Sequence, residues 1–159
     1  MTLPRRLSAT GLVLAAVTVF AAPATAAPAD CLGTPSDTWL TVSIEGLRNG
    51  NGLVTVALYP DDSRQFLAKG GTIKNNRLNA SAPVTRACVF VPKPGVYAIA
   101  VYHDEDSSQK LNRSGLGLPT EGYGFSNNPA TLAGLPAFRS VRLNVPKAGL
   151  TTHVRMKYP

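Results

Sequence analysis

The sequence predicts an all-β domain, and three observations lead to this fold class. Short segments in which apolar and polar residues alternate recur at regular spacing, with Gly, Pro, Asn or Asp between them. Helical periodicity is not sustained over any useful length. One segment, Val96–His103, is apolar on both alternating faces, as in a strand buried between two layers. Together they indicate a single antiparallel β-sandwich of about seven strands, Ig-like or transthyretin-like, with a small closed barrel as the alternative.

The first 26 residues predict a secretory signal peptide. Arg5 and Arg6 form a basic start, residues 12–22 are a short apolar run, and Ala24-Thr25-Ala26 is a typical cleavage signal. The apolar run is shorter than the roughly 20 residues of a transmembrane helix, so no transmembrane segment is expected in the mature protein. We therefore expect a secreted or periplasmic protein that is cleaved near Ala26.

Length and charge limit what the mature chain can be. The signal peptide leaves about 133 of 159 residues, enough for an N-terminal segment over 27–37 and one β-sandwich domain over 38–159. Without Arg5 and Arg6, 14 Lys and Arg stand against 9 Asp and Glu, a net charge of +5. The basic residues are scattered singly along the chain, so nucleic acid is not an expected partner. We expect a monomer.

The two cysteines, Cys31 and Cys88, both lie in the mature part of the chain. In an oxidising compartment such a pair usually forms one disulfide bond. The bond would tie the N-terminal segment to a strand, and closing so long a loop stabilises a fold by about 4 kcal/mol at most. A redox role is not favoured, because the chain has no C-x-x-C motif.

The first two strands are predicted to form a hairpin. Residues 38–47 and 53–59 both alternate, and two Asn-Gly pairs over 48–52 supply the backbone freedom of a tight reversal. The apolar residues of the alternation are expected to face the core: Leu40, Val42, Ile44, Val54, Val56 and Leu58.

The rest of the domain is predicted in the same way. An acidic segment after the second strand can cap one helical turn that places Phe66 and Leu67 over one end of the core. The middle strands are predicted over 77–82, 84–91 and 96–103. The last two strands, over 138–145 and 150–158, are expected to pair as a hairpin around 146–149.

A long loop over about 104–137 follows the buried strand and is the expected functional part. Loops of this length in compact domains are usually either functional or disordered. This one contains leucines and aromatic residues that disordered segments lack, so we expect it to be ordered. Because loops on rigid scaffolds often carry function, we place the candidate site at 103–128.

Three motifs resemble a known family. They are L-T-V-x-I-E-G-L-R-N-x-x-G-x-V-x-V-A-L-Y, P-G-V-Y-A-I-A-V-Y-H-D and G-L-G-L-P-T-E-G-Y-G-F-S-N-N. The chain from Thr38 to Tyr158 is similar to the secreted bacterial family catalogued as domain of unknown function 2141. The resemblance implies a single exported β-sandwich module. It implies no mechanism, because the family has no established activity.

The family's loop after the His-Asp pair is similar to the calcium loops of dockerins. Here Asp104 and Asp106 match the first and third positions, Ser108 stands at the fifth and Asn112 at the ninth. Gln109 replaces the turn glycine, and the glutamate of an EF-hand is missing. Weak calcium binding is therefore expected, and no other cofactor. The alternative is an acidic turn whose carboxylates accept backbone N–H groups of the loop.

The expected ligand-binding residues are His103, Glu121, Tyr123, Phe125, Asn127 and Asn128. Aromatic residues between glycines and amides suit a sugar or peptide surface. The alternative is that the two aromatic rings pack on the end of the sandwich. A histidine at a strand end usually orders the loop that follows, and nothing in the spacing brings it to His153 as a zinc site would require.

The sequence thus predicts a non-enzymatic exported module that binds an envelope or extracellular ligand, or supports the envelope, through 103–128. One alternative is a hydrolase acting on a glycan or cell-wall substrate, with its acid and base among Asp104, Asp106, Glu121 and His103. The other is a purely structural domain. We assign no catalytic residue. Convergence of the acidic groups inside a concave pocket would favour the hydrolase.

Overall fold

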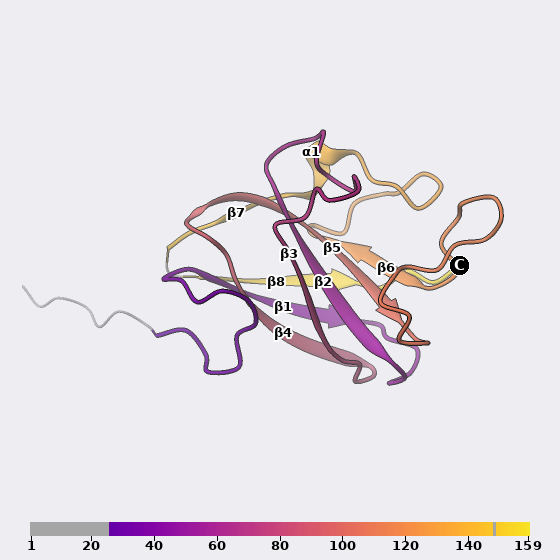
Figure 1. Cartoon of the computed structure of the whole chain (residues 1–159), viewed down its shortest axis with the longest axis horizontal. Coiled ribbons are helices and arrows are strands. Elements are labelled where there is room, and N and C mark those ends of the chain that lie inside the picture. Colours follow the sequence, from indigo (N-terminus) through magenta and orange to yellow (C-terminus); the bar gives the residue numbers. More distant parts are fainter. Residues whose placement is uncertain (1–25, 148) are drawn as a thin grey trace, which may run out of the picture.

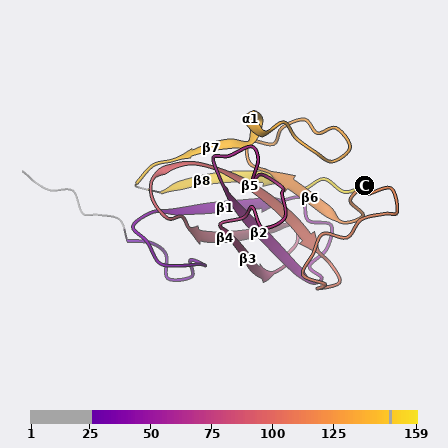
Figure 2. The same ribbon diagram turned by 45° about the horizontal axis from the view of Figure 1, so that its top comes forward.

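The computed structural model describes residues 26–147 and 149–159 as two β-sheets packed face to face (Figure 1, Figure 2). The elements are β1 (Trp39–Glu45), β2 (Leu53–Pro60), β3 (Lys74–Asn79), β4 (Val84–Phe90), β5 (Gly95–Asp104), β6 (Gly122–Phe125), α1 (Phe138–Val141), β7 (Arg142–Val145) and β8 (Leu150–Arg155). One sheet has the order β4-β1-β8, and the other has the order β3-β2-β5-β6, with β7 also on β5. The predicted all-β sandwich is confirmed.

The predicted signal peptide, apart from Ala26, lies outside the described residues. Within the described part of the chain, no helix is long and apolar enough to cross a membrane.

The main core lies between the two sheets. All six side chains that the alternation places inward on β1 and β2 are fully buried, as predicted. From the other strands, Val89, Ile99 and Val154 are among the side chains that join this layer. Full burial of one Val, Leu or Ile side chain contributes about 1.5–3 kcal/mol, so these strands supply most of the burial that holds the sheets together.

The predicted hairpin between β1 and β2 is wrong. β1 pairs with β4 and β8, whereas β2 pairs with β3 and β5, so the segment over 46–52 crosses from one sheet to the other. Leu47 in this crossing is buried, and the N–H groups of Gly46 and Leu47 donate to the Pro83 carbonyl at 3.0 and 3.1 Å. The buried side chain of Leu47 and these two hydrogen bonds thus fix the connection between the sheets. The turn of a tight hairpin would not bury such a side chain.

The predicted final hairpin is wrong as well. Residues 138–141 form the short helix α1, β7 pairs with the first half of β5, and β8 pairs with β1 in parallel. The segment after β7 therefore crosses between sheets. Val141 packs on the outer face of the five-stranded sheet whereas Val145 packs in the main core, so the apolar residues of this segment do not share one face.

A second, smaller cluster covers part of the outer face of the five-stranded sheet. Ala98 and Ala100 of β5 point outward into it, while Ile99 points into the main core. The ring of Phe66 lies 6.2 Å from that of Phe125 over these alanines. This cluster explains why β5 is apolar on both faces. The predicted turn after β2 thus delivers Phe66 to a covering position, whereas Leu67 is 38% exposed.

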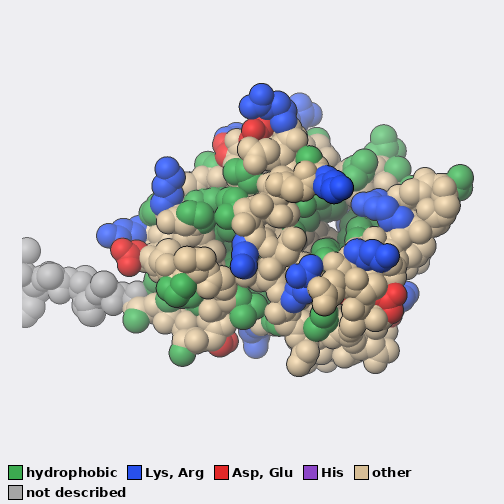
Figure 3. All heavy atoms as spheres, in the orientation of Figure 1, with side chains coloured by type: hydrophobic (Ala, Val, Ile, Leu, Met, Phe, Trp, Pro, Cys, Tyr) green, Lys and Arg blue, Asp and Glu red, His purple; other side chains and the backbone are tan. Residues whose placement is uncertain are grey.

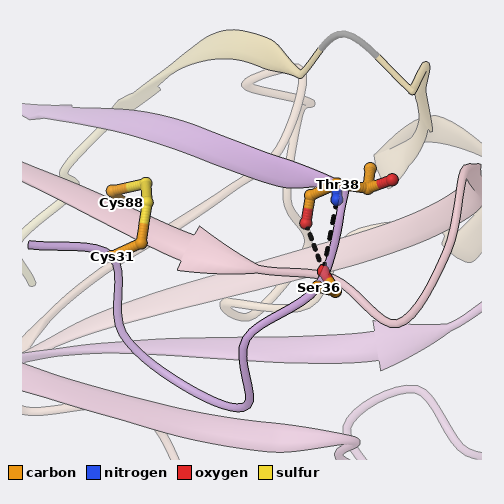
Figure 4. The surroundings of a disulfide bond; sticks show 4 residues. All are labelled: Cys31, Ser36, Thr38 and Cys88. Carbon is orange, nitrogen blue, oxygen red and sulfur yellow. Dashed lines mark hydrogen bonds between the residues drawn. A yellow bond between two sulfur atoms is a disulfide. The ribbon is translucent and has the colours of Figure 1, made fainter. Parts of the chain in front are cut away.

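The N-terminal segment is attached to β4. Cys31 and Cys88 form a disulfide bond (Figure 4), and beside it the N–H of Leu32 donates to the Cys88 carbonyl at 2.8 Å. A few residues later, Ser36 Oγ donates to the carbonyl of Val91, just past the end of β4, at 2.6 Å. The segment is thus attached at both of its ends.

Candidate functional site

The loop predicted over about 104–137 contains one further strand, β6, which adds to the second half of β5. Its sequence, G-Y-G-F, does not predict a strand, because glycine is depleted in strands. The structure shows why the glycines are there. A Cβ on Gly124 would lie 2.6 Å from Val154 Cγ1 and 2.9 Å from the Arg155 carbonyl oxygen, so β6 passes too close to β8 for a side chain.

Between β5 and β6, the chain folds back onto its own carboxylates. Asp104 is fully buried, and its two carboxylate oxygens accept the N–H groups of Ser108 at 2.8 Å and Gln109 at 2.7 Å. Glu121 is also buried and accepts the N–H groups of Glu105 at 3.1 Å and Asn112 at 2.9 Å. These carboxylates therefore replace the backbone partners that a regular strand or helix would supply.

Three carboxylates meet in this loop. One oxygen each from Asp104, Asp106 and Glu121 lie within 4.8 Å of one another. Ser108 Oγ lies 3.2 Å from Asp104 Oδ1, and it is 3.5 Å from Oδ1 of Asn112. Hydrogen bonds from Ser108 and then Asn112 lower the pKa of Asp106 to about 2, so this group is ionised at neutral pH.

The four residues that the sequence proposed as calcium ligands therefore do come together. Glu121, which the sequence assigned to a ligand surface, joins them from the far end of the loop. Oxygen atoms of this kind are what calcium binds, and these five side chains are the ones that could hold it. Backbone N–H groups of the loop already donate to several of these oxygens, so a calcium ion would have to compete with them. Calcium binding stays a prediction.

The same geometry bears on the hydrolase alternative. The acidic groups converge, but they point into their own loop and accept its N–H groups. Tyr123 and Phe125 border a cavity whose described lining residues include no Asp, Glu or His. The arrangement can order a loop or hold a cation, and it does not present an acid and a base to this cavity.

His103 is a buried link between distant parts of the chain. One ring nitrogen, Nε2, lies 2.8 Å from the Asn51 carbonyl, and Nδ1 lies 2.8 Å from the Tyr158 hydroxyl. Because a carbonyl only accepts, the neutral ring carries its proton on Nε2 and accepts from Tyr158. His153 lies elsewhere, exposed on the outer face of the smaller sheet, 2.6 Å from Glu45. The structure does not bring the two histidines together.

Asn127 and Asn128 bind the protein's own backbone. Both have positive φ, 64° and 49°. Asn127 Nδ2 donates to the Arg142 carbonyl at 2.8 Å. Asn128 accepts the N–H of Arg155 at 2.7 Å and donates to the His153 carbonyl at 3.0 Å, as a neighbouring strand would do along the edge of β8. The side-chain amides of both residues are therefore already hydrogen-bonded to the protein's own backbone.

Tyr123 and Phe125 lie at a cavity on the outer face of the five-stranded sheet. The cavity has a volume of about 260 Å³, and Figure 3 shows the hollow on this face. Ala57 and Ala100, which are register partners on β2 and β5, form its floor. Its aromatic lining comes from four rings: Tyr59, Tyr102, Tyr123 and Phe125. Arg113 is the only charged residue among the described residues that line it.

Sequence reasoning missed two of these four rings, Tyr59 and Tyr102. Ala57-Leu58-Tyr59 and Ala100-Val101-Tyr102 repeat the pattern Ala-x-Tyr on two strands. In an antiparallel pair, small residues facing each other leave a hollow and the tyrosines flank it. The repeat was a usable signal, but only once β2 and β5 were known to be neighbours.

Comparison with known proteins gives one finding. Residues 42–153 match the model of a family described as an uncharacterized protein conserved in bacteria, domain of unknown function 2141. Neither a curated protein nor a solved structure matches the chain.

Proposed function

Because the chain belongs to the bacterial family of domain of unknown function 2141, we propose a function from the site alone: an exported, non-enzymatic binding module. Its ligand sits in the cavity on the outer face of the five-stranded sheet. The 103–128 loop takes part by supplying Leu111, Arg113 and the two aromatic residues of β6 to the lining.

The composition of the cavity lining carries the proposal. Ligand sites are concave, largely apolar and furnished with a few polar groups that orient the ligand. Four aromatic rings, a floor of alanine and the polar side chains of Thr72, Asn75 and Arg113 meet this description.

The size and chemistry of the cavity limit the ligand. About 260 Å³ is slightly below the range of roughly 300–1,000 Å³ typical of drug-sized ligands. One ring therefore fits, either a single sugar unit or one side chain of a larger molecule. Aromatic faces favour a flat partner, and Arg113 favours one that carries a carboxylate or phosphate group.

The experiment is a thermal-shift screen of the mature protein, residues 27–159, against monosaccharides, sugar acids and cell-wall fragments. A ligand that prefers the folded state raises the melting temperature by mass action. We expect Tyr102→Leu and Arg113→Gln to weaken the shift. Arg86→Gln, an exposed arginine on the other sheet, is the matched control and should leave the shift unchanged.

Two outcomes would contradict the proposal. An equal shift in Tyr102→Leu, Arg113→Gln and the control would place the ligand outside the cavity. Conversion of the ligand to a product by the wild type, but not by an Asp104→Asn variant, would establish the hydrolase.

A further inference from the structure

Two tight turns project leucine side chains beside the cavity. In the first, the N–H of Gly117 donates to the Ser114 carbonyl at 2.9 Å, and Leu116 is 89% exposed. In the second, Leu132 and Leu135 exchange both backbone hydrogen bonds at 2.9 Å, and Leu132 is 86% exposed. Both turns are held by their own hydrogen bonds, so the leucines are presented by defined structure.

The two turns lie side by side at one end of the molecule. Both ribbon views place them next to each other (Figure 1, Figure 2), and a Cβ on Gly134 of the second turn would lie 3.1 Å from the ring of Pro119, just after the first. Figure 3 shows hydrophobic side chains at both tips, with Lys and Arg side chains close by. We call residues 114–118 and 132–135 the leucine turns.

A cation lies at the base of each leucine turn. Arg113 Nη1 donates to the Gly117 carbonyl at 2.8 Å. Lys157 Nζ donates to the Pro129 carbonyl at 2.9 Å, because the C-terminal segment pairs with Tyr123 of β6 and brings Lys157 under the second turn. Each turn thus has an apolar tip above a fixed positive charge.

This part of the chain is also depleted in acidic residues. Residues 107–159 contain seven Lys and Arg and one acidic residue, Glu121, a net charge of +6. Glu121 is only 6% exposed, and its two oxygens accept backbone N–H groups. Of these bases, Arg142 is paired with Asp61 and is not available to an anion. The exposed Asp106, just before this segment, accepts a hydrogen bond from Asn112 beside Arg113. The attraction of the leucine turns for anions therefore rests on Arg113 and Lys157.

We infer that the leucine turns dock the protein on an anionic membrane surface. Leu116 and Leu132 enter the boundary between headgroups and acyl chains, and Arg113 and Lys157 lie at the level of the phosphates. Apolar side chains in front of basic ones are the pattern of interfacial membrane binding, in which apolar burial and attraction to anionic lipid add together. A protein partner is less favoured, because a stable protein interface buries a large continuous area, whereas the leucine turns offer two short apolar tips.

Docking would also orient the cavity. Arg113 and Leu135 belong both to the cavity lining and to the region of the leucine turns. The cavity would therefore open beside the bilayer. The inference goes beyond the proposed ligand binding and does not depend on it.

The experiment is co-sedimentation of the mature protein with vesicles of phosphatidylcholine alone, or of phosphatidylcholine and phosphatidylglycerol in equal parts. We expect binding to the anionic vesicles only, weakened by added salt. The double variant Leu116→Ser/Leu132→Ser should bind at least about tenfold more weakly, since two exposed apolar side chains are lost. Its matched control is Ile73→Ser/Val84→Ser, which removes two hydrophobic residues that are 40% and 36% exposed outside the leucine turns.

A second measurement reports insertion directly. The chain has one tryptophan, Trp39, which is buried in β1 and gives a constant background. In Leu132→Trp, the added tryptophan should shift its emission to shorter wavelength with anionic vesicles and not with neutral ones. Arg113→Gln/Lys157→Gln should weaken binding, and the control Arg86→Gln/Lys93→Gln should not.

Three outcomes would overturn the inference. These are no binding to anionic vesicles, equal binding by the leucine double variant and its control, or an unshifted emission of Leu132→Trp on bound vesicles. Self-association of the lipid-free wild type that the leucine double variant abolishes would assign the surface to a second copy of the chain instead. The thermal shift by the cavity ligand should persist in the leucine double variant, so failure here and failure of the proposed function are distinguishable.

Discussion

Phe125 shows how a single side chain can hold a long loop. Its ring is 6% exposed and lies 6.2 Å from Phe66 and 5.9 Å from Tyr123. We predict that Phe125→Ala lowers the free energy of unfolding by about 3–5 kcal/mol, the usual cost of deleting a buried phenylalanine ring. Amide exchange should become faster from about 111 to 128.

Protection at Val42 and Ile99 in the main core should remain in this variant, measured by hydrogen exchange. Leu118→Ala, which removes a 43% exposed side chain from the same loop, is the control and should change little. Unchanged exchange in the loop, or an equal loss of protection in the core strands, would refute the prediction.

We expect Asp106 to make the loop over 104–112, here called the acidic loop, sensitive to pH. Its pKa is lowered from 3.8 to about 2, first by the hydrogen bond from Ser108 and then by that from Asn112. A carboxyl group whose pKa is lower in the folded state stabilises that state above its unfolded pKa and loses the effect as the pH falls. We predict that loop order over 104–112 declines between about pH 4 and pH 2.

Amide exchange in the loop, measured across this range by NMR, checks the prediction. In Asp106→Asn the decline over the same interval should be smaller, because one titrating group is gone. A wild-type loop whose exchange keeps the same protection down to pH 2 would contradict it.

The disulfide bond acts on a whole element, since it holds the N-terminal segment on β4. We predict that Cys31→Ser lowers the free energy of unfolding by about 2–4 kcal/mol, because the unfolded chain regains the freedom that the closed loop removes. Urea unfolding of wild type and variant measures the difference. Wild type under reducing conditions is the matched control and should lose a similar amount. Free thiols in the unreduced, unfolded wild type would disprove the bond.

The acidic loop is the second element with a testable property. We predict calcium binding with a dissociation constant of about 10⁻⁴ M or weaker, in the range of extracellular modules. The reason is that the ion must compete with the loop N–H groups for the oxygens of Asp104 and Glu121. Isothermal calorimetry should show the weak heat abolished in Asp106→Asn and kept in Asp30→Asn, an exposed acid outside the loop. Micromolar affinity would contradict the prediction.

At the scale of the whole molecule, the edges of the sheets decide whether copies of the chain associate. Exposed strand edges are sites for pairing with another chain. Here the amide of Asn128 occupies part of the edge of β8, and Leu32 pairs with the edge of β4. We therefore predict a monomer in the absence of lipid, measured by sedimentation velocity.

Asn128→Gly tests this edge, because glycine accepts the positive φ of 49° while the amide is removed. The N–H of Arg155 should exchange faster in this variant, and self-association should rise with concentration. Asn127→Gly, at a φ of 64° but away from β8, is the matched control. A wild-type dimer would contradict the prediction.

The sequence by itself determined the β class, the inward faces of β1 and β2 and the one possible disulfide pair. These are local properties. Alternation indicates which face of a strand is buried, and two cysteines allow only one intramolecular disulfide pairing. The double-sided burial of β5 was also visible, because both faces of that strand are apolar.

Only the tertiary structure decided which strands are neighbours. Alternation does not identify the partner of a strand, so both predicted hairpins were wrong. The sequence did not predict β6, because its glycines are required by the close approach of β8 and are untypical of a strand. The candidate sites depend on the same long-range pairing. Glu121 reaches Asp104 only because β6 returns along β5, and the cavity exists only because Ala57 and Ala100 face each other. Contacts between residues far apart in the chain are set by packing, which no short stretch of sequence encodes.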